Sequence, residues 1–322
     1  MPLPERQLIA HIRQMAGRGL RNGIVQGIGD DCAVLQFGRG YDSLVTTDFC
    51  LEGVHFRRDW HSPESAGHRC LARGLSDIAA MGGEPVAVFL SLALPGDLPQ
   101  GWVRRFIRAM VGLAKNYGAS LAGGDTAQSP GGILADIIVV GRVPRGRAIL
   151  RSSARAGERI YVSGSLGGSA AAVREMERQP KRRLSPREYR RHFFPEPRVE
   201  IGRVLREKRI ASAMIDLSDG LSTDLSHICD ESGVGAEIDA GLVPRARIGG
   251  KEVDPDLVLH GGEDYELLFT APPGKRVPET IGGVSLTCIG RVTGRRGIFV
   301  RDAAGARKKL EARGWEHFRS RA

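Results

Sequence analysis

Hydrophobic positions in the first 144 residues alternate between helical spacing and short continuous runs. Apolar side chains three and four positions apart predict a short opening helix at residues 6–16 and two longer helices at residues 63–83 and 98–117. Runs typical of strands occupy residues 32–35, 44–47, 86–94, 119–122 and 133–143. This alternation of strands and helices is typical of an α/β fold.

A similar pattern restarts after Pro144-Arg145-Gly146-Arg147. A strand at residues 159–163 leads through a glycine-rich turn into an alanine-rich helix. Further helices are predicted at residues 198–208 and 221–231, and further strands near Ala213, Ala236, Glu266, Leu286 and Gly297. The basic insertion at residues 179–191 predicts an exposed loop. We therefore expect two α/β domains, residues 1–144 and residues 145–322.

Composition limits the classes of protein that fit this pattern. The chain is 41% hydrophobic and 26% charged, which is ordinary for a globular protein. No apolar run reaches the roughly 18–20 residues that cross a bilayer, and the first residues lack the layout of a signal peptide, so we expect no membrane contact and a cytoplasmic location. The five cysteines are scattered and odd in number, which argues against a disulfide framework and against a zinc site.

The formal net charge of +10 makes nucleic-acid binding an interpretation to weigh, because basic surfaces release counterions from phosphates. The arginines are spread along the chain, and their densest runs, at residues 181–191 and 295–309, contain few aromatic residues. The acidic stretches would also repel a nucleic-acid backbone. We interpret the excess charge as a solvated arginine surface that attracts small anionic substrates, without a nucleic-acid partner.

Four stretches far apart in the sequence place an aspartate beside glycine or a small hydroxyl residue. They are Gly27-Ile28-Gly29-Asp30-Asp31, Thr46-Thr47-Asp48, Gly123-Gly124-Asp125-Thr126 and Asp216-Leu217-Ser218-Asp219-Gly220. Glycine lets backbone N–H groups approach a phosphate, and aspartate supplies the hard oxygen ligands that Mg²⁺ prefers. Each stretch alone is ordinary turn chemistry. Together, each after an apolar run, they predict a magnesium and polyphosphate site at the ends of strands.

Two further segments carry acidic residues in unusual places. Asp77 lies among apolar neighbours near the end of a predicted helix, where it opposes the helix dipole, so we weigh a metal ligand against a polar-face residue. In Gly261-Gly262-Glu263-Asp264-Tyr265-Glu266, a glycine pair brings acids into a turn. We expect Glu263 to contact substrate, and Asp264 and Glu266 to have structural roles. Neither a Walker A sequence nor the protein-kinase signature set occurs, so phosphate binding must be built otherwise.

Taken in order, these stretches resemble the thiamine-monophosphate kinase family, part of an ATP-binding superfamily that includes aminoimidazole-ribonucleotide synthetase and selenophosphate synthetase. The resemblance covers nearly the whole chain and is carried by residues 27–34, 46–56, 75–82, 123–126, 151–152, 215–224 and 261–269. It implies a two-domain α/β (α+β) fold like that of aminoimidazole-ribonucleotide synthetase. It also implies ATP-dependent phosphorylation of thiamine monophosphate to thiamine diphosphate, and a homodimer joined through the N-terminal sheets.

The resemblance implies a role for individual residues. For several Mg²⁺ ions it implies ligation by Asp31, Thr47, Asp48, Asp77, Asp125, Asp216 and Asp219, with Thr46 and Asp30 beside them. For ATP it implies contacts from Gly124, Asp125, Arg151 and Ser218, and for thiamine monophosphate it implies contacts from His55, Glu263 and Trp315. The chain departs from the family at Arg73-Gly74, where Val-Asn is common, and in its unusually basic insertion at residues 179–191.

Transfer between two phosphates needs positioning and charge neutralisation, because the acceptor oxygen is already largely ionised at neutral pH. The expected reaction therefore requires no general base. Two alternatives stay open at this point: an ATP-dependent synthetase of the same superfamily, and a non-catalytic protein that binds divalent cations or nucleic acid. ATP consumption in the presence of thiamine monophosphate would separate the kinase from the non-catalytic protein.

Overall fold

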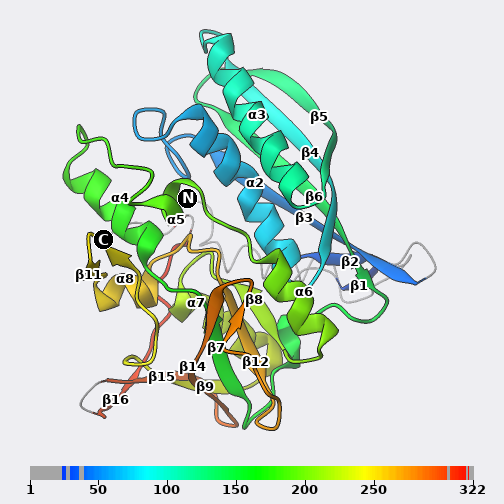
Figure 1. Cartoon of the computed structure of the whole chain (residues 1–322), viewed down its shortest axis with the longest axis vertical. Coiled ribbons are helices and arrows are strands. Elements are labelled where there is room, and N and C mark those ends of the chain that lie inside the picture. The colour runs from blue at the N-terminus through cyan, green and yellow to red at the C-terminus, as the bar shows by residue number, and fades with distance from the viewer. Residues whose placement is uncertain (1–23, 27–29, 36–39, 303–304, 317, 319–322) are drawn as a thin grey trace.

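The computed structural model describes residues 24–26, 30–35, 40–302, 305–316 and 318. The helix expected at residues 6–16, and Gly27 to Gly29, lie outside this range. Each half of the chain builds a β-sheet with helices packed on it (Figure 1). The first sheet ends at Pro144 and the second begins at Arg159, and the domain boundary after residue 144 stays a prediction.

The first sheet has the strand order β1-β2-β3-β6-β4-β5. Its neighbours are antiparallel except β4 and β5, which are parallel and joined by helix α3. Helices α2 (Pro63–Ala80) and α3 (Gln100–Asn116) lie together along one face of this sheet (Figure 1). The strands are β1 (Ile24–Gln26), β2 (Ala33–Leu35), β3 (Tyr41–Leu51), β4 (Glu84–Pro95), β5 (Ser120–Ser129) and β6 (Leu134–Pro144).

Alternation along β3 defines the two faces of this sheet. Its even-numbered side chains point toward the helices, and Leu44 and Cys50 are buried there in one core with Leu75 and Phe106. The odd-numbered side chains point to the opposite face, where Phe49 keeps 54% of its surface exposed. One face of the sheet therefore belongs to the core, and the other presents apolar surface to its surroundings.

The second sheet has the order β16-β15-β9-β14-β7-β12-β8, with β13 (Thr280–Ile281) paired to β14. Strands β15 and β9 are parallel, and the other pairs are antiparallel. Its strands are β7 (Arg159–Ser163), β8 (Met214–Asp216), β9 (Gly235–Asp239), β12 (Leu267–Ala271), β14 (Val284–Thr293), β15 (Gly297–Arg301) and β16 (Arg307–Lys309). A separate hairpin pairs β10 (Arg247–Ile248) with β11 (Lys251–Glu252).

Apolar side chains bury both faces of the second sheet. On one face Ile160 and Val162 of β7 pack with Leu225 of α7. On the other, Tyr161 stacks on Phe269 with ring centroids 5.2 Å apart, in a core shared with α6. The helical segments of this half are η1 (Arg151–Ser153), α4 (Gly168–Arg178), α5 (Arg190–Phe193), α6 (Val199–Glu207), α7 (Leu221–Ser232) and α8 (Pro255–His260).

Helix α2 connects the two cores. It begins at Pro63 behind Ser62, whose side chain accepts the N–H of Ser65 (3.2 Å) as an N-cap. Its middle packs on the first sheet, whereas Ala79 in its last turn belongs to the core of α6 and the second sheet. A Cβ added to Gly202 of α6 would lie 2.0 Å from the Ala79 carbonyl oxygen, so these two helices touch backbone to backbone.

Two expected motif positions need correction. The strand expected at residues 119–122 continues as β5 through Gly124 and Asp125, and Thr46-Thr47-Asp48 lies inside β3 rather than after it. Both motifs are therefore within strands, not in the loops that follow strands. The reason is long-range pairing: β5 hydrogen-bonds along β4, and this pairing sustains a polar, glycine-rich strand that has no apolar pattern of its own.

The basic insertion at residues 179–191 is more than the expected exposed loop. Its arginines are exposed or half-buried, but Leu184 and Tyr189 are buried with Met176 and Phe193 in a small core on α4 and α5. The apolar residues that anchor this segment are single and widely spaced, so they give no periodic signal in the sequence.

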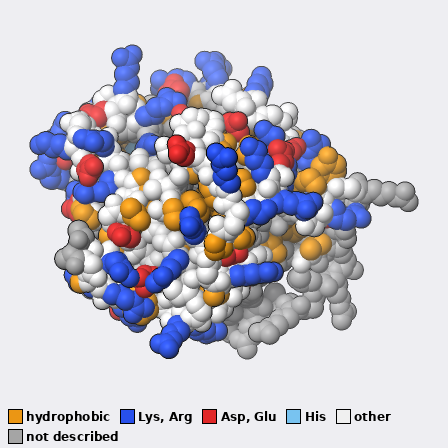
Figure 2. Space-filling model, turned by 60° about the horizontal axis from the view of Figure 1, so that its bottom comes forward, with side chains coloured by type: hydrophobic (Ala, Val, Ile, Leu, Met, Phe, Trp, Pro, Cys, Tyr) orange, Lys and Arg blue, Asp and Glu red, His pale blue; other side chains and the backbone are white. Residues whose placement is uncertain are grey.

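The surface bears on two of the sequence-based expectations. No helix among the described residues is long and apolar enough to span a membrane. Figure 2 shows Lys and Arg side chains scattered over one face of the molecule among polar and apolar groups, rather than gathered into one patch. That distribution agrees with a solvated arginine surface.

The contact between α2 and α6 generates a stability prediction. Gly202→Ala should lower the free energy of unfolding by about 1–3 kcal/mol, because its Cβ would force the two helices apart. Gly112→Ala is the matched control: this glycine also lies inside a helix but has no neighbour near its Cβ, so alanine should stabilise by up to about 1 kcal/mol. Denaturant unfolding of both variants measures the difference, and equal effects would contradict the packing argument.

Candidate active site

Three aspartates from three separate segments meet beside α2. Asp31 precedes β2, Asp77 lies in the last turn of α2 and Asp216 ends β8, and one carboxylate oxygen from each lies within 4.8 Å of the others. Thr46 Oγ1 donates to Asp77, and Ser76 Oγ donates to Asp216 at 2.6 Å. Burial, followed by repulsion from neighbouring carboxylates, raises the pKa of both Asp77 and Asp216 well above the usual range. This set of hard oxygen donors fits a divalent cation such as Mg²⁺.

Arg151 of η1 neutralises part of this cluster. Its Nε lies 2.8 Å from Asp31 Oδ2 and its Nη2 lies 2.8 Å from Oδ1, while its backbone N–H donates to Asp30 (3.0 Å). Burial and the charge of Asp31 raise the pKa of Asp30 to about 7, against the lowering effect of Arg151. Arg151 thus binds Asp31 through its guanidinium and Asp30 through its backbone N–H, and the excess negative charge among the described residues of the cluster favours a bound cation.

A second acidic group lies at the start of α7. Carboxylate oxygens of Asp219 and Asp224 and a ring nitrogen of His227 lie within 4.8 Å of one another. Asp224 accepts the backbone N–H groups of Asp219 (3.2 Å) and Gly220 (3.0 Å), and burial raises the pKa of Asp224. Asp224 therefore closes the turn that presents Asp219, the one member of this group that the sequence resemblance implicates.

The turn at residues 261–265 places Glu263 against α2. Glu263 (φ 63°) and Tyr265 (φ 50°) both adopt positive φ, which costs a residue with a Cβ on the order of 1–3 kcal/mol. The turn is held because Glu263 N–H donates to the Ser218 carbonyl (2.7 Å) and Tyr265 N–H donates to the Leu217 carbonyl (2.9 Å). This strained turn fixes the Glu263 carboxylate beside the loop between β8 and α7.

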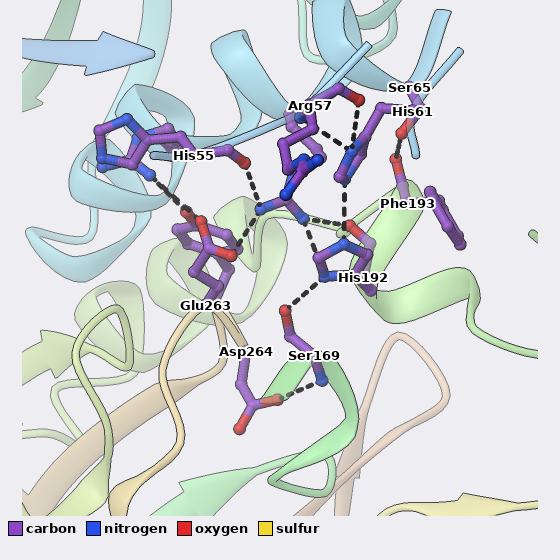
Figure 3. A network of polar contacts seen from close by, with 12 residues as sticks. His55, Arg57, His61, Ser65, Ser169, His192, Phe193, Glu263 and Asp264 are labelled. Atoms are coloured by element: carbon purple, nitrogen blue, oxygen red, sulfur yellow. Dashed lines mark hydrogen bonds and ion pairs between the residues drawn. The ribbon is translucent and has the colours of Figure 1, made fainter. Parts of the chain in front are cut away.

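Two arginines one helical turn apart on α2 bind the Glu263 carboxylate. Arg69 Nη2 lies 2.6 Å from Glu263 Oε2, and Arg73 Nη1 lies 3.4 Å from Oε1. Arg73 also binds both oxygens of Asp48, with Nε 3.0 Å from Oδ2 and Nη2 2.9 Å from Oδ1. The imidazole of His55 and the carboxylate of Glu263 point toward each other (Figure 3). The fold thus brings Asp48 and two predicted substrate residues into one group.

A chain of buried polar side chains continues from Arg69 into the second half. Figure 3 shows three of its members, His61, His192 and Ser169. Arg69 Nη1 donates to the carbonyl of His192, whose Nε2 lies 3.0 Å from His61 Nε2 and whose Nδ1 lies 2.9 Å from Ser169 Oγ. The Ser169 N–H donates to Asp264 at 3.4 Å. Burial, followed by the charge of Arg69, lowers the pKa of His61 to about 3 and also lowers the pKa of His192. Both rings are therefore neutral at pH 7.

The structure separates some predicted residues from this site. Thr47 and Asp125 lie on the face of the first sheet opposite α2: Thr47 Oγ1 donates to Asp136 (2.7 Å), and Asp125 lies opposite Ser91, which itself lies opposite Asp136. Strand β5 is also three strands away from β3. Metal ligation by Thr47 and Asp125, and the ATP contacts of Gly124 and Asp125, stay predictions.

Two other predicted residues lie on the second half. Ser218 is in the loop between β8 and α7, and its carbonyl holds the Glu263 turn. The Trp315 N–H donates to the Asp219 carbonyl (3.1 Å), and the Trp315 side chain is 44% exposed. Trp315 thus lies beside the same loop, and its contact with substrate stays a prediction.

Comparison with known proteins follows the same division of the chain. Residues 29–143 match the family described as AIR synthase related protein, N-terminal domain, and residues 155–303 match AIR synthase related protein, C-terminal domain. The thiamine-monophosphate kinase of Escherichia coli (strain K12) is 38% identical over 314 residues, which cover 94% of each chain. The chain belongs to the thiamine-monophosphate kinase family.

Solved structures of thiamine-monophosphate kinases share the fold. The structure of AaThiL complexed with AMPPCP and TMP superposes with a TM-score of 0.85 at 33% identity, covering 98% of this chain and 97% of that one. The thiamine-monophosphate kinase from Stenotrophomonas maltophilia K279a gives a TM-score of 0.73 at 36% identity, with coverages of 91% and 95%. The aminoimidazole-ribonucleotide-synthetase-like fold expected from the sequence is thereby confirmed.

Sequence reasoning missed side chains that hold this thiamine-monophosphate kinase site together. Arg69 and Arg73 are four residues apart on a helix whose residues are mostly buried, and that spacing was a usable signal. His61 and His192 lie 131 positions apart, and no local pattern joins them. Asp48, expected with the other metal ligands, is bound by Arg73 rather than grouped with Asp31, Asp77 and Asp216.

The histidine pair generates a pH prediction. Because the folded pKa of His61 is about 3 against an ordinary 6.5, its contribution to stability is complete above pH 6.5. That contribution is lost as the pH falls from 6.5 toward 3, since the unfolded chain then takes up the proton. The free energy of unfolding should fall by up to about 1.4 kcal/mol per pH unit for each such histidine.

The variant His61→Gln isolates this effect. It should unfold with a shallower pH dependence between pH 6.5 and 4.5 than the parent chain, because one of the two neutral histidines is gone. Denaturant titrations of both proteins across this range measure the two slopes. Identical slopes would contradict the assignment of His61 as a neutral, buried residue.

Proposed function

We propose that this chain transfers the γ-phosphoryl group of ATP to the phosphate of thiamine monophosphate, giving thiamine diphosphate and ADP. The observation that carries the proposal is the meeting of Asp31, Asp77 and Asp216 next to the strained turn of Glu263, in a chain aligned with this kinase family over 94% of its length. The proposed location is the cytoplasm, where ATP is available and the five free thiols stay reduced.

The carboxylate cluster is the proposed site for Mg²⁺. Asp31, Asp77 and Asp216 would hold the cation, with Asp219 as a further ligand; ligation by Asp48, which the sequence resemblance implies, would require a carboxylate oxygen to leave Arg73. Thr46 already donates to Asp77. Bound there, Mg²⁺ would supply neutralisation of the phosphate charges. The raised pKa values of Asp77 and Asp216 support this role, because burial and neighbouring carboxylates outweigh the lowering effect of Arg151 on Asp216.

The residues of the chain fit a reaction without a general base. His55 Nδ1 accepts the N–H of Leu51 (3.0 Å), so in the neutral ring the proton lies on Nε2. His55 then serves as a hydrogen-bond donor near the acceptor phosphate rather than as a base. Arg151 and Ser218 are proposed to contact ATP, while Glu263 and Trp315 are proposed to receive the cationic thiazolium and the flat pyrimidine of the acceptor.

A homodimer through the first sheet is part of the same proposal. The face opposite α2 presents Tyr41, Phe49 and Leu134, which keep 48%, 54% and 37% of their surfaces exposed. An apolar sheet face of this kind is typical of a protein–protein interface. Thr47 and Asp125 lie on the same face, so a dimer would bring both residues to its interface.

The function is tested by ADP release from ATP and Mg²⁺, with and without thiamine monophosphate. ADP should form only with the acceptor present, and Asp216→Asn should lower kcat by about 100-fold or more through loss of a charge-neutralising ligand. The metal-free Asp216→Asn protein should melt at the same or a higher temperature, because one of three repelling carboxylates is removed. Near-normal turnover at saturating Mg²⁺ would refute the metal site.

Asp230→Asn is the control for this variant. Asp230 is exposed near the end of α7, outside the cluster, and the same change of charge there should leave kcat within twofold.

The dimer is tested by Phe49→Asp, which places a charge in the middle of the exposed apolar face. Light scattering coupled to size exclusion should show a dimer for the parent chain and a monomer for the variant. The variant should be monomeric because a dimer would bury the introduced carboxylate without a partner, which is costly. Thr293→Asp, on the far sheet, should leave the dimer intact, and a monomeric parent chain would refute the proposed interface.

A further inference from the structure

Arg73 lies between Asp48 of the first sheet and Glu263 of the second half. Its Nε and Nη2 face the two oxygens of Asp48, and its Nη1 lies 3.4 Å from Glu263 Oε1 and 3.1 Å from the Tyr265 hydroxyl. Only 15% of its side-chain surface is exposed. One planar guanidinium therefore joins a carboxylate of the first sheet to a carboxylate and a phenol on the strained turn of the second half.

The geometry suits arginine and no other residue. Two parallel N–H groups match a carboxylate edge to edge, while the remaining nitrogen stays available for a second acceptor. A lysine ammonium is a single point charge and could reach one carboxylate well but not both. With Arg69 also bound to Glu263, the group contains two positive and two negative side chains and is electrically balanced.

The neighbouring glycine makes this reach possible. A Cβ at Gly74 would lie 2.7 Å from Val139 Cγ2 and 3.1 Å from Ile137 Cδ1, so glycine lets α2 lie close against β6. Strand β6 pairs with β3, which carries Asp48 opposite Ile137. Gly74 and Arg73 therefore act together. Gly74 allows close contact between α2 and the sheet, and at that distance Arg73 can bind Asp48. These two positions are one of the two places where the chain departs from the family pattern, the other being the basic insertion at residues 179–191.

We propose that Arg73 is a positioning residue for the acceptor substrate, acting through Glu263. The guanidinium holds the Glu263 carboxylate at a fixed angle and distance from Asp48, so that the thiamine end and the phosphate end of thiamine monophosphate are received together. This inference rests on the proposed function. It predicts that Arg73 affects acceptor affinity strongly and nucleotide affinity little.

A purely structural ion pair makes a different prediction. If Arg73 only joined the two halves, its removal would lower the melting temperature and weaken the binding of both substrates equally. Arg206 provides that comparison, because it is a buried arginine of α6 that bonds the Gly82 carbonyl (2.8 Å) and lies 3.5 Å from Glu84, at the contact between α2 and α6 rather than at the site.

The test is calorimetric binding of thiamine monophosphate to the full chain without ATP, supported by steady-state kinetics. Arg73→Met should weaken thiamine monophosphate binding by about tenfold and raise its KM similarly, with KM for ATP within twofold. Arg73→Lys should recover part of the loss, because it keeps the charge but not the fork. Arg206→Met should lower the melting temperature and leave thiamine monophosphate affinity within twofold.

A double-mutant cycle shows whether Arg73 acts through Glu263. In a Glu263→Gln background, Arg73→Met should weaken thiamine monophosphate binding by no more than twofold, since the group that it positions is already lost. A full tenfold loss in that background would overturn the inference. Unchanged thiamine monophosphate affinity of Arg73→Met would also overturn it. Should Arg73→Met not fold, unchanged affinity of both Arg73→Lys and Arg73→Gln would overturn the inference in its place. A parent chain that neither binds nor phosphorylates thiamine monophosphate would overturn the proposed function and the inference together.

Discussion

A stripe of charged side chains on a buried helix is the constraint that shapes this molecule. Arg69, Arg73 and Asp77 are four residues apart along α2, so they share one side of a helix whose other residues are almost all buried. Charges buried in this way need partners of opposite charge or hydrogen-bond donors. Those partners come from outside the helix: Glu263 for Arg69, Asp48 for Arg73 and Thr46 for Asp77. The candidate site therefore consists of the charged residues of α2 together with the partners that the fold brings to them.

Charge is balanced at one end of the stripe and unbalanced at the other. Around Arg69 and Arg73, two guanidinium groups meet two carboxylates and the sum is zero. Around Asp77, the carboxylates of Asp31 and Asp216 meet one guanidinium of the described residues, that of Arg151, which binds Asp31. Asp77 also lies in the last turn of α2, where a carboxylate opposes the helix dipole. The unbalanced end is therefore suited to a cation, and only through a bound cation to a phosphate, whereas the balanced end carries no net charge.

Sequence patterns predicted the parts of this arrangement that local physics determines. Pro63 and apolar spacing predicted the start of α2, which ends at Ala80 rather than at residue 83, and spacing alone predicted α3 to within two residues. Asp31 and Asp216 were singled out because glycine and small hydroxyl neighbours are a local signal, whereas Asp77 was singled out by its apolar neighbours near a helix end. The pattern could not show on which sheet face Thr47 and Asp125 lie, because that depends on the register of β3, β6, β4 and β5.

The remaining features depend on contacts between distant segments. Strand β5 extends through a polar motif because β4 pairs with it, and the insertion at residues 179–191 is anchored by single apolar residues that fit a small core. The partners of Arg69 and Arg73 come from positions up to 194 residues away. No local pattern encodes such a pairing. The departure from the family pattern at Arg73-Gly74 is the local sign that this part of the chain differs.

Both halves of the chain contribute to the site, so the stability of the fold and the binding of ligands are related. Glu263 is held by arginines of the first half, and its turn keeps two residues at positive φ. The strain in that turn and the repulsion within the aspartate cluster both reduce the stability of the ligand-free fold. Ligands that neutralise the cluster relieve one of these costs, so their binding stabilises the same docking of α2, α6 and the second sheet that creates the site. In this thiamine-monophosphate kinase family member, ligand binding at the aspartate cluster therefore adds to the stability of the folded chain.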